Sequence, residues 1–380
     1  MFRISVVFSL FFVACQGIFA QVELSGKVIN DLNGEPVFRA SVYINNTTIG
    51  TVTNEKGEYV LKGITPGKYE IVVSHVGFEM IVYQIIAGKD PMAITFRPVP
   101  KVKEMRDILV VTSSQRKKWL EILRINFLGQ TSAAEKSRIL NEDDIFFVRT
   151  GSKEMIKAYS ELPLVIENRE LGYRVYFELQ EFFYDAAVGQ TTFYGYSRYE
   201  ELKDSPGEPA KKYLRARARN YTGSTLHFYQ SLLAGQTEQQ GFSMYVTRRV
   251  PPVDSIPRSA RGNDQRSDTP KDARSPTLAF KVGPQDILFK DSARNMMYLR
   301  WEGVLSVRFK DDPYYKASLS RNVMLQGNLP RGFQSNIMMV RSPAYIDENG
   351  TFADPLSVQY SGFWMYEKLA NMMPINYRPD

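Results

Sequence analysis

Residues 26–79 carry the clearest fold signal in this chain: GKVINDLNGEPVFRASVYINNTTIGTVTNEKGEYVLKGITPGKYEIVVSHVGFE. Short runs of alternating apolar and polar residues are separated by turn signals, among them Asn33-Gly34 and Thr65-Pro66-Gly67. Alternation with a period of two is typical of half-buried strands, and Asn-Gly readily adopts the positive φ of a tight turn. The stretch therefore predicts a small all-β module.

The same pattern continues on both sides of this stretch. Seven short strands separated by turns predict a β-sandwich. The predicted strands are 22–29, 37–44, 48–53, 58–61, 69–74, 80–86 and 92–96.

An ordered set of motifs in this region resembles the carboxypeptidase regulatory-like domain. The resemblance implies a transthyretin-like sandwich within residues 21–98, and it implies no peptidase activity, because that domain is an accessory without catalytic residues. The same module occurs at the N-terminus of many TonB-dependent outer-membrane receptors of Gram-negative bacteria. The motifs are Gly26-Lys27-Val28, Gly34-Glu35-Pro36-Val37, TVTNEKGEY at 51–59, ITPGKY at 64–69 and Gly77-Phe78.

The first residues have the pattern of a signal peptide. Arg3 precedes an apolar run at 4–14 that is too short to span a bilayer, and Ala20 offers a small residue for cleavage. Residues 1–20 are therefore expected to be removed, which would export the protein to the periplasm or the outer membrane. Lipid attachment at Cys15 is the alternative, although Phe12 stands where a lipoprotein signal normally has Leu.

The composition restricts the possible partners. Cys15 is the only cysteine, so cleavage after Ala20 would leave a chain without disulfide bonds. The net charge of +7 comes from 48 basic and 41 acidic residues. This excess favours a mixed, solvated surface over an anionic partner such as a phosphorylated glycolipid, and export argues against nucleic acid. No segment after the signal approaches the about 18 apolar residues of a membrane-spanning helix.

The two histidines give little support to an enzyme. A catalytic zinc site generally needs three protein ligands, whereas the chain has only His75 and His227, in different predicted regions. A Ser–His–Asp triad would have to use His227, but no Gly-x-Ser-x-Gly motif is present, and Ser224 lies only three residues away. We therefore interpret both histidines as structural or surface residues.

Other catalytic signals are also weak. The acidic pairs Asp143-Asp144 and Asp311-Asp312 are typical of helix starts or turns, and their use as a glycosidase pair would need a separation across a cleft. The sequence has no Walker loop and no dinucleotide-binding glycine motif. We therefore predict no catalytic residue, no metal ligand and no cofactor.

The remainder divides into a linker at 99–114 and a larger α+β region at 115–380, mostly of antiparallel strands. The part after 114 is far too short to form a receptor barrel. Residues 251–276 are rich in Pro, Ser, Asp and Arg and predict a loop or disordered segment, within which Asp254-Ser255-Ile256 resembles an O-glycosylation acceptor. Helices are predicted at 115–128, 131–139, 211–233 and 363–373, strands at 173–179, 182–187 and 191–199, and a hairpin turn at 347–350.

Some basic and aromatic residues of this region have two interpretations. Arg215, Arg217 and Arg219 favour a solvated or salt-bridged helix face over an anion site. Trp301 and Trp364 favour core positions, although exposed tryptophans can stack on sugars.

Four blocks (163–173, 221–228, 346–350 and 362–374) resemble a group of exported Gram-negative envelope proteins that carry the same N-terminal module. That resemblance implies no known activity. We expect a non-enzymatic binding or assembly protein of the envelope, with a protein or glycan partner, an outer-membrane barrel being one candidate.

Two alternatives remain open, namely a hydrolase with its site in the C-terminal region and an accessory to TonB-linked uptake. A pocket around His227 with a carboxylate in hydrogen-bond reach would favour the hydrolase, and an exposed sheet edge would favour the binding protein.

Overall fold

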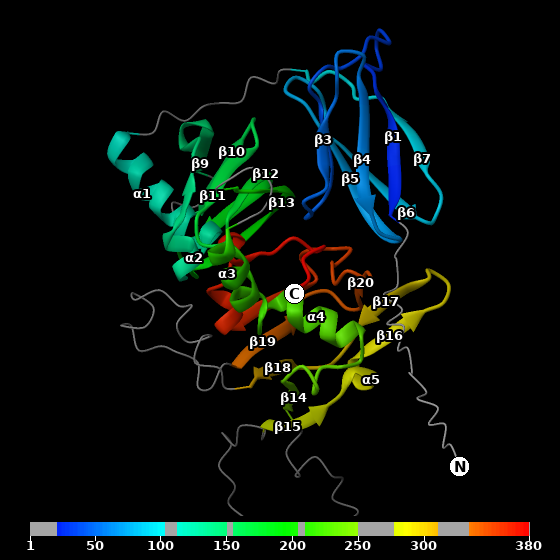
Figure 1. Cartoon of the computed structure of the whole chain (residues 1–380). Coiled ribbons are helices and arrows are strands. Elements are labelled where there is room, and N and C mark those ends of the chain that lie inside the picture. The colour runs from blue at the N-terminus through cyan, green and yellow to red at the C-terminus, as the bar shows by residue number, and fades with distance from the viewer. Residues whose placement is uncertain are drawn as a thin grey trace, which may run out of the picture.

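The computed structural model describes residues 21–102, 112–149, 155–203, 210–249, 277–310 and 334–379. Figure 1 shows the blue N-terminal strands and the green strands β9–β13 on two sides, with the yellow-to-red strands β14–β20 below them. Several predictions fall outside the described residues. They are the signal peptide 1–20 with Cys15, linker residues 103–111, the loop 251–276 with Asp254-Ser255-Ile256, and Asp311-Asp312.

The N-terminal module is a sandwich of two sheets, which confirms the predicted β-sandwich. One sheet has the order β4-β1-β7 and the other β3-β2-β5-β6, and apolar side chains of both sheets form one core. Strand β1 pairs antiparallel with β4 and parallel with β7. The strands are β1 (Val22–Val28), β2 (Ser41–Ile44), β3 (Gly50–Val52), β4 (Glu58–Ile64), β5 (Gly67–Ser74), β6 (Ile81–Ala87) and β7 (Met92–Phe96).

The second strand of the module is shorter than the predicted 37–44. Residues 37–40 instead form a turn, in which Arg39 has a φ of 59°. The Thr53 hydroxyl holds this turn, because it accepts the Ala40 N–H at 2.8 Å and donates to the Val37 carbonyl at 2.6 Å. The apolar alternation did not reveal the turn, because Phe38 is apolar but 50% exposed and Ala40 is buried without belonging to a strand.

A six-stranded antiparallel sheet forms the first part of the second region. Its centre is the long strand β12, which pairs with β11 and β10 along one side and with β13 along the other. The separate strand predicted at 182–187 is therefore wrong, because a bulge between Leu179 and Glu181 lets β12 continue. The strands are β8 (Ser137–Ile139), β9 (Ile145–Arg149), β10 (Met155–Ser160), β11 (Leu164–Asn168), β12 (Tyr173–Asp185) and β13 (Gln190–Glu201).

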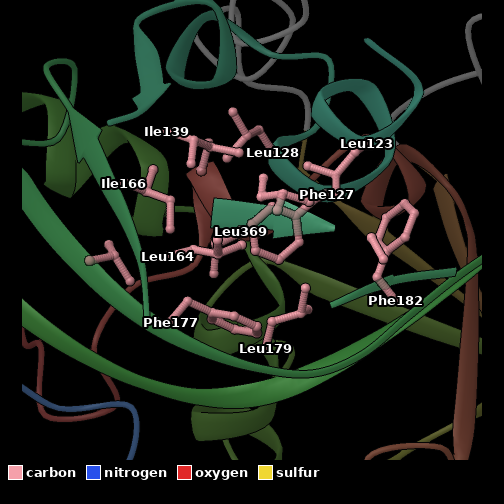
Figure 2. Close-up of a cluster of buried hydrophobic side chains, with 14 of the residues drawn as sticks. Leu123, Phe127, Leu128, Ile139, Leu164, Ile166, Phe177, Leu179, Phe182 and Leu369 are labelled. Carbon is pink, nitrogen blue, oxygen red and sulfur yellow. The ribbon is translucent and has the colours of Figure 1, made fainter. Parts of the chain in front are cut away.

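One face of this sheet is covered by α1 (Ser113–Leu123), the π-helix η1 (Arg124–Leu128) and α2 (Ser132–Glu135). Figure 2 shows Leu123, Phe127 and Leu128 directed toward strand residues that include Leu164, Ile166 and Phe177. The predicted helix 115–128 is confirmed, with its last turn widened to a π-helix. The helix predicted at 131–139 is only one turn long, because β8 begins at Ser137.

The single helix predicted at 211–233 is wrong. The chain forms α3 (Lys211–Tyr221) and α4 (Thr225–Leu233), separated by residues 222–224. Gly223 has a φ of 80°, a conformation that is costly for other residues, and the Ser224 side chain caps α4 by accepting the His227 N–H. The apolar period continued across this break because both helices bury one face.

A five-stranded sheet, β15-β14-β18-β19-β21, and a three-stranded sheet, β16-β17-β20, complete the second region around a shared core. All their pairings are antiparallel, so the predicted α+β, mostly antiparallel class is confirmed. The elements are β14 (Phe242–Arg249), β15 (Thr277–Val282), α5 (Pro284–Ile287), β16 (Leu288–Asp291), β17 (Met296–Leu299), β18 (Val304–Phe309), β19 (Gln334–Met339), β20 (Ala344–Ile346) and β21 (Val358–Gly362).

The end of the chain differs from the predicted helix at 363–373. It contains two separate 3₁₀ turns, η5 (Phe363–Met365) and η6 (Leu369–Asn371). The hairpin turn at 347–350 is confirmed by the hydrogen bond from the Gly350 N–H to the Asp347 carbonyl at 3.1 Å and by the bridge between Ile346 and Phe352.

The module docks on the second region through backbone pairing with the edge of β13. The Asn46 N–H donates to the Ser197 carbonyl at 2.8 Å, and the Tyr199 N–H donates to the Thr47 carbonyl at 2.9 Å. On the other side of the same turn, the Ile375 N–H donates to the Asn46 carbonyl at 2.8 Å. The turn between β2 and β3 therefore joins the β13 edge to the C-terminal tail.

Part of the outer face of the module's four-stranded sheet is buried at this junction. Tyr43 and Val72 face each other across β2 and β5, point away from the module core and are only 2% and 0% exposed. Ser74, on the same face as Val72, lies beside Glu178 of β12, whose carboxyl pKa is raised by burial. The outer face therefore packs against β12 and β13.

The other end of β5 contacts the second region through Lys68. Its ammonium donates to the Asn295 carbonyl at 2.9 Å, its carbonyl accepts from Asn349 at 3.2 Å, and its N–H donates to the Glu348 carboxylate. The module is thus held at two separate points, which fixes its orientation.

Removing the apolar contact at the junction should loosen the docking. We expect Val72→Ser to lower the free energy of unfolding by about 2 kcal/mol, because it replaces fully buried apolar surface by a hydroxyl. Urea unfolding and limited proteolysis of the linker measure the effect. Ile86 lies on the same sheet face but is 74% exposed, so Ile86→Ser is the matched control. Equal losses in both variants would contradict a packed interface at Val72.

The turn that contacts Lys68 should make stability depend on pH. Burial raises the pKa of Asp347 from 3.8 to about 6, although the Thr351 and Asn349 N–H groups partly oppose this. The folded state then holds the proton more tightly than the unfolded state, so the contribution is complete below about pH 4 and is lost as the pH rises through about 6. In the wild type, the free energy of unfolding should fall by an amount on the order of 1–2 kcal/mol across this pH range, and Asp347→Asn should remove this fall. Urea unfolding at several pH values measures it.

Asp354→Asn is the control for this prediction. The pKa of the wild-type Asp354 carboxyl is lowered, chiefly by the Leu356 N–H, so Asp354 contributes stability that is lost as the pH falls. A pH profile of Asp347→Asn that matches the wild type would show that Asp347 is not the responsible group.

Candidate functional site

A cleft lies where the module, the six-stranded sheet, α3 and the C-terminal tail meet, and we call it the junction cleft. Its volume is about 410 Å³. The module contributes Thr48, β12 and β13 contribute Tyr173 and Glu201, α3 contributes residues from 214 to 218, and the tail contributes residues from 374 to 378. The cleft is therefore assembled from segments that are far apart in the sequence.

The buried guanidinium of Arg217 forms the inner wall of the junction cleft. Arg217 is 2% exposed, and it donates from Nε to the Leu171 carbonyl at 2.8 Å and from Nη2 to the Gly172 carbonyl at 3.0 Å. Its Nη1 donates to the Glu201 carboxylate at 2.5 Å, and its Cζ atom lies 3.9 Å from the centre of the Tyr173 ring. The buried charge is thus neutralised and hydrogen-bonded, as burial of a cation requires.

The position of Arg217 on α3 explains why it is buried. The residues of α3 that turn inward are Tyr213, Ala216 and Arg217, at the i, i+3, i+4 spacing of a core-facing helix stripe. Arg215 and Arg219 lie off this stripe and are exposed. The predicted solvated face is therefore confirmed for Arg215 and Arg219. Arg217 is salt-bridged, but it belongs to the interior.

The C-terminal tail also lines the junction cleft. Asn376 accepts the Thr48 N–H at 3.3 Å and donates to the Thr48 hydroxyl at 2.9 Å, which attaches the tail to the module. Arg378 folds back on the tail, where its Nη1 donates to the carbonyls of Ile375 and Tyr377 at 2.9 and 2.7 Å.

The charges of the junction cleft are unbalanced. Among the described residues that line it, Glu201 is the only carboxylate, and it is paired with Arg217. Within the described residues, Arg215 and Arg378 form no ion pair, so two exposed positive charges remain. Burial also raises the pKa of the Tyr173 phenol, which keeps it neutral at physiological pH.

The ring of His227 is enclosed rather than presented to a substrate. Its Nδ1 accepts the Gly223 N–H at 3.1 Å, so Nε2 carries the proton and lies 3.2 Å from the Gln240 side-chain oxygen. Burial lowers its pKa, and the ring packs against Tyr221, Phe242 and Phe309. Among the described residues, its hydrogen-bond partners include no carboxylate.

Ser224 does not act as a partner of the His227 ring. Its hydroxyl donates to the Tyr221 carbonyl at 2.7 Å and accepts the backbone N–H of His227 at 3.2 Å. The sequence spacing of these two residues therefore reflects a helix cap. His75 lies in the module and packs edge-on against Phe78, so the structure does not bring the two histidines together.

The remaining candidates, the Asp143-Asp144 pair and the two tryptophans, lie in a turn and in the core. Asp143 and Asp144 belong to the 3₁₀ turn η2 (Glu142–Asp144), where Asn141 donates to Asp144 at 2.9 Å. Trp364 is 3% exposed and donates to the Gly223 carbonyl at 3.0 Å, which confirms its core position. Trp301 is partly buried against the same core.

The described residues also contain neither a cluster of metal-ligating side chains nor a membrane-spanning helix. No group of three or more His, Cys, Asp or Glu side chains has an arrangement that could hold a metal ion. No helix there is long and apolar enough to cross a membrane.

Sequence reasoning missed most of the junction cleft. Thr48, Glu201 and the tail from 374 to 378 carry no motif, and only the folded chain brings them together. One signal was available, since Arg217 shares the inward stripe of Tyr213 and Ala216 on a predicted helix.

The comparisons identify the module but not the whole chain. Residues 24–110 match the family described as the CarboxypepD_reg-like domain, as the sequence motifs indicated. A comparison with curated proteins finds no match.

Among solved structures, the similarities are distant. The pilus 2b backbone protein of group B streptococcus is 13% identical, with 20% of this chain and 40% of that chain covered and a TM-score of 0.19. Catechol 1,2-dioxygenase from Acinetobacter sp. ADP1 is 13% identical, with 26% and 58% covered and a TM-score of 0.20. The minor pilin of Streptococcus agalactiae is 11% identical, with 24% and 48% covered and a TM-score of 0.18. The chain thus spans less than two thirds of each of these proteins, and scores this low say nothing about function.

Removing the buried guanidinium should disrupt the junction cleft. Arg217→Ala deletes one ion pair and two carbonyl contacts and leaves Glu201 without its partner, so we expect a loss of about 3–5 kcal/mol in the free energy of unfolding. Arg219→Ala, on the exposed face of the same helix, should change stability by less than about 0.5 kcal/mol. Urea unfolding compares the two variants. Similar values for both would mean that Arg217 does not support the fold.

Proposed function

We propose that this chain is an exported, non-enzymatic binding or assembly protein of the cell envelope, with a protein or glycan partner. The observation that carries the proposal is the junction cleft, which forms only when the module, the six-stranded sheet, α3 and the tail are docked. A preformed concave site with several fixed polar groups is the usual form of a binding pocket.

The chemistry of the junction cleft suits recognition more than catalysis. Arginine stays protonated at all physiological pH values, and the single carboxylate of Glu201 is already paired with Arg217. Tyr173 is kept neutral by burial. These groups donate hydrogen bonds and provide charge, and they are poorly suited to exchange protons at neutral pH.

An exposed sheet edge supports a protein partner. Strand β15 is at the edge of the five-stranded sheet, and Leu278 and Phe280 on it are 46% and 40% exposed. Unpaired edge strands can accept a further strand from another chain. The module supplies the accessory part of the proposal, because residues 24–110 match the CarboxypepD_reg-like domain family.

The hydrolase alternative has one observation in its favour. Burial raises the pKa of Glu367 to about 8, a range that suits a general acid or base at neutral pH. Glu367 bridges to Gly129, directly after the π-helix η1. Loss of a measured hydrolytic activity in Glu367→Gln, with the fold intact, would establish this alternative over ours.

Affinity purification from the native envelope tests the proposed function. We expect the tagged wild-type protein to recover one component in stoichiometric amount, identified by mass spectrometry. Val72→Ser should recover less, because it loosens the docking that forms the junction cleft, and Ile86→Ser should recover as much as the wild type. An outer-membrane barrel as the recovered component would assign the accessory role in TonB-linked uptake. Recovery of the protein alone would count against an assembly role.

A further inference from the structure

We propose that the junction cleft binds an acidic saccharide, that is, a sugar carrying a carboxylate or phosphate group. This inference rests on the proposed binding function and names the ligand class of that site. It follows from three features of the lining, namely two guanidiniums that form no ion pair within the described residues, a partly exposed carboxylate beside them and a partly apolar wall.

The two guanidiniums come from different segments of the chain. Arg215 projects from α3 and is exposed, and Arg378 belongs to the tail. Arg378 is held by Nη1 bonds to two backbone carbonyls, and its Nε and Nη2 atoms make no hydrogen bond within the described residues. A guanidinium with free donors on adjacent nitrogens matches the two oxygens of a carboxylate or phosphate.

The inner wall does not cancel this charge. Arg217 and Glu201 neutralise each other at 2.5 Å, so the excess at the mouth of the cleft is that of Arg215 and Arg378. The same tight pairing explains why Glu201 leaves both outer arginines available to a ligand.

Glu201 favours a saccharide over a simple anion as the ligand. Its side chain is 33% exposed in the cleft, and its carboxylate oxygens can accept hydrogen bonds from sugar hydroxyls, whereas a simple anion gains little from such acceptors. The Thr48–Asn376 pair adds an amide and a hydroxyl at the rim. Hydroxyl-binding groups next to positive charge fit a ligand that carries both hydroxyls and one acidic group.

The size and the apolar surface agree with this ligand. A volume of about 410 Å³ lies in the range of small-molecule pockets. Leu214 is 36% exposed and lines the same wall as Arg215, so a C–H face of a sugar ring has an apolar surface to contact. The occupant is thus a small molecule or the end of a glycan chain.

Calorimetric titration of the purified protein at low salt tests the proposal with four probes: glucuronic acid, glucose 6-phosphate, glucose and inorganic phosphate. We expect both acidic sugars to bind, and glucose and phosphate each to bind at least about tenfold more weakly, because each lacks one of the two recognised features. Added salt should weaken the binding of the acidic sugars.

Variants locate the site. Arg215→Ala and Arg378→Ala should each weaken the acidic sugars by about tenfold or more, whereas Arg219→Ala, exposed on the same helix as Arg215, should leave the affinity unchanged. Circular dichroism and thermal unfolding confirm that the variants fold.

Each contrary result overturns a defined part of the proposal. Absence of binding for every probe removes the site, equal binding of glucose removes the acidic group, and equal binding of phosphate removes the sugar. Unchanged affinity in Arg215→Ala and Arg378→Ala places any binding elsewhere. If the wild-type protein recovers an envelope component but binds no acidic sugar, this inference is wrong and the proposed function stands. If it binds acidic sugars but recovers no envelope component, only the assembly role is contradicted.

Discussion

The arrangement of this protein depends on the backbone pairing between residues 45–47 and the edge of β13. Edge strands carry unpaired N–H and C=O groups that must be covered or exposed to other chains, and here one module of the same chain covers them. Asn46 serves both sides of the contact, since its N–H and side chain bind Ser197 and its carbonyl accepts from Ile375. Without this pairing the tail would lose its hydrogen bonds to the module, and the junction cleft would lose the side that Thr48 lines.

The buried cation Arg217 is the second constraint. A charged side chain can occupy an inward helix position only when its charge is compensated in place. The turn at Leu171 and Gly172 supplies two carbonyls, Glu201 supplies the counter-charge, and Tyr173 supplies the ring face. Because Glu201 is paired with Arg217, Arg215 and Arg378 form no ion pair within the described residues.

The fold could be predicted where the signal was local. The alternation in 26–79 and its Asn-Gly and Pro-Gly turns act over a few residues, and all seven module strands were found. Errors arose where a residue far away decided the outcome. The Thr53 hydroxyl turned residues 37–40 away from β2, and the bulge at Leu179 allowed β12 to run on against three neighbours. The helix break at Gly223 left the apolar period intact, so periodicity could not show it.

The sequence by itself determined the module, the antiparallel α+β class of the remainder and the absence of familiar catalytic motifs, because these follow from local spacing and residue type. It also placed Arg215, Arg217 and Arg219 on one helix. Only the tertiary structure decided that Arg217 is buried while its neighbours are free, and that Thr48, Glu201 and residues 374–378 surround them. The physical reason is that burial and charge compensation depend on segments separated by up to several hundred residues, whose contact no local pattern encodes.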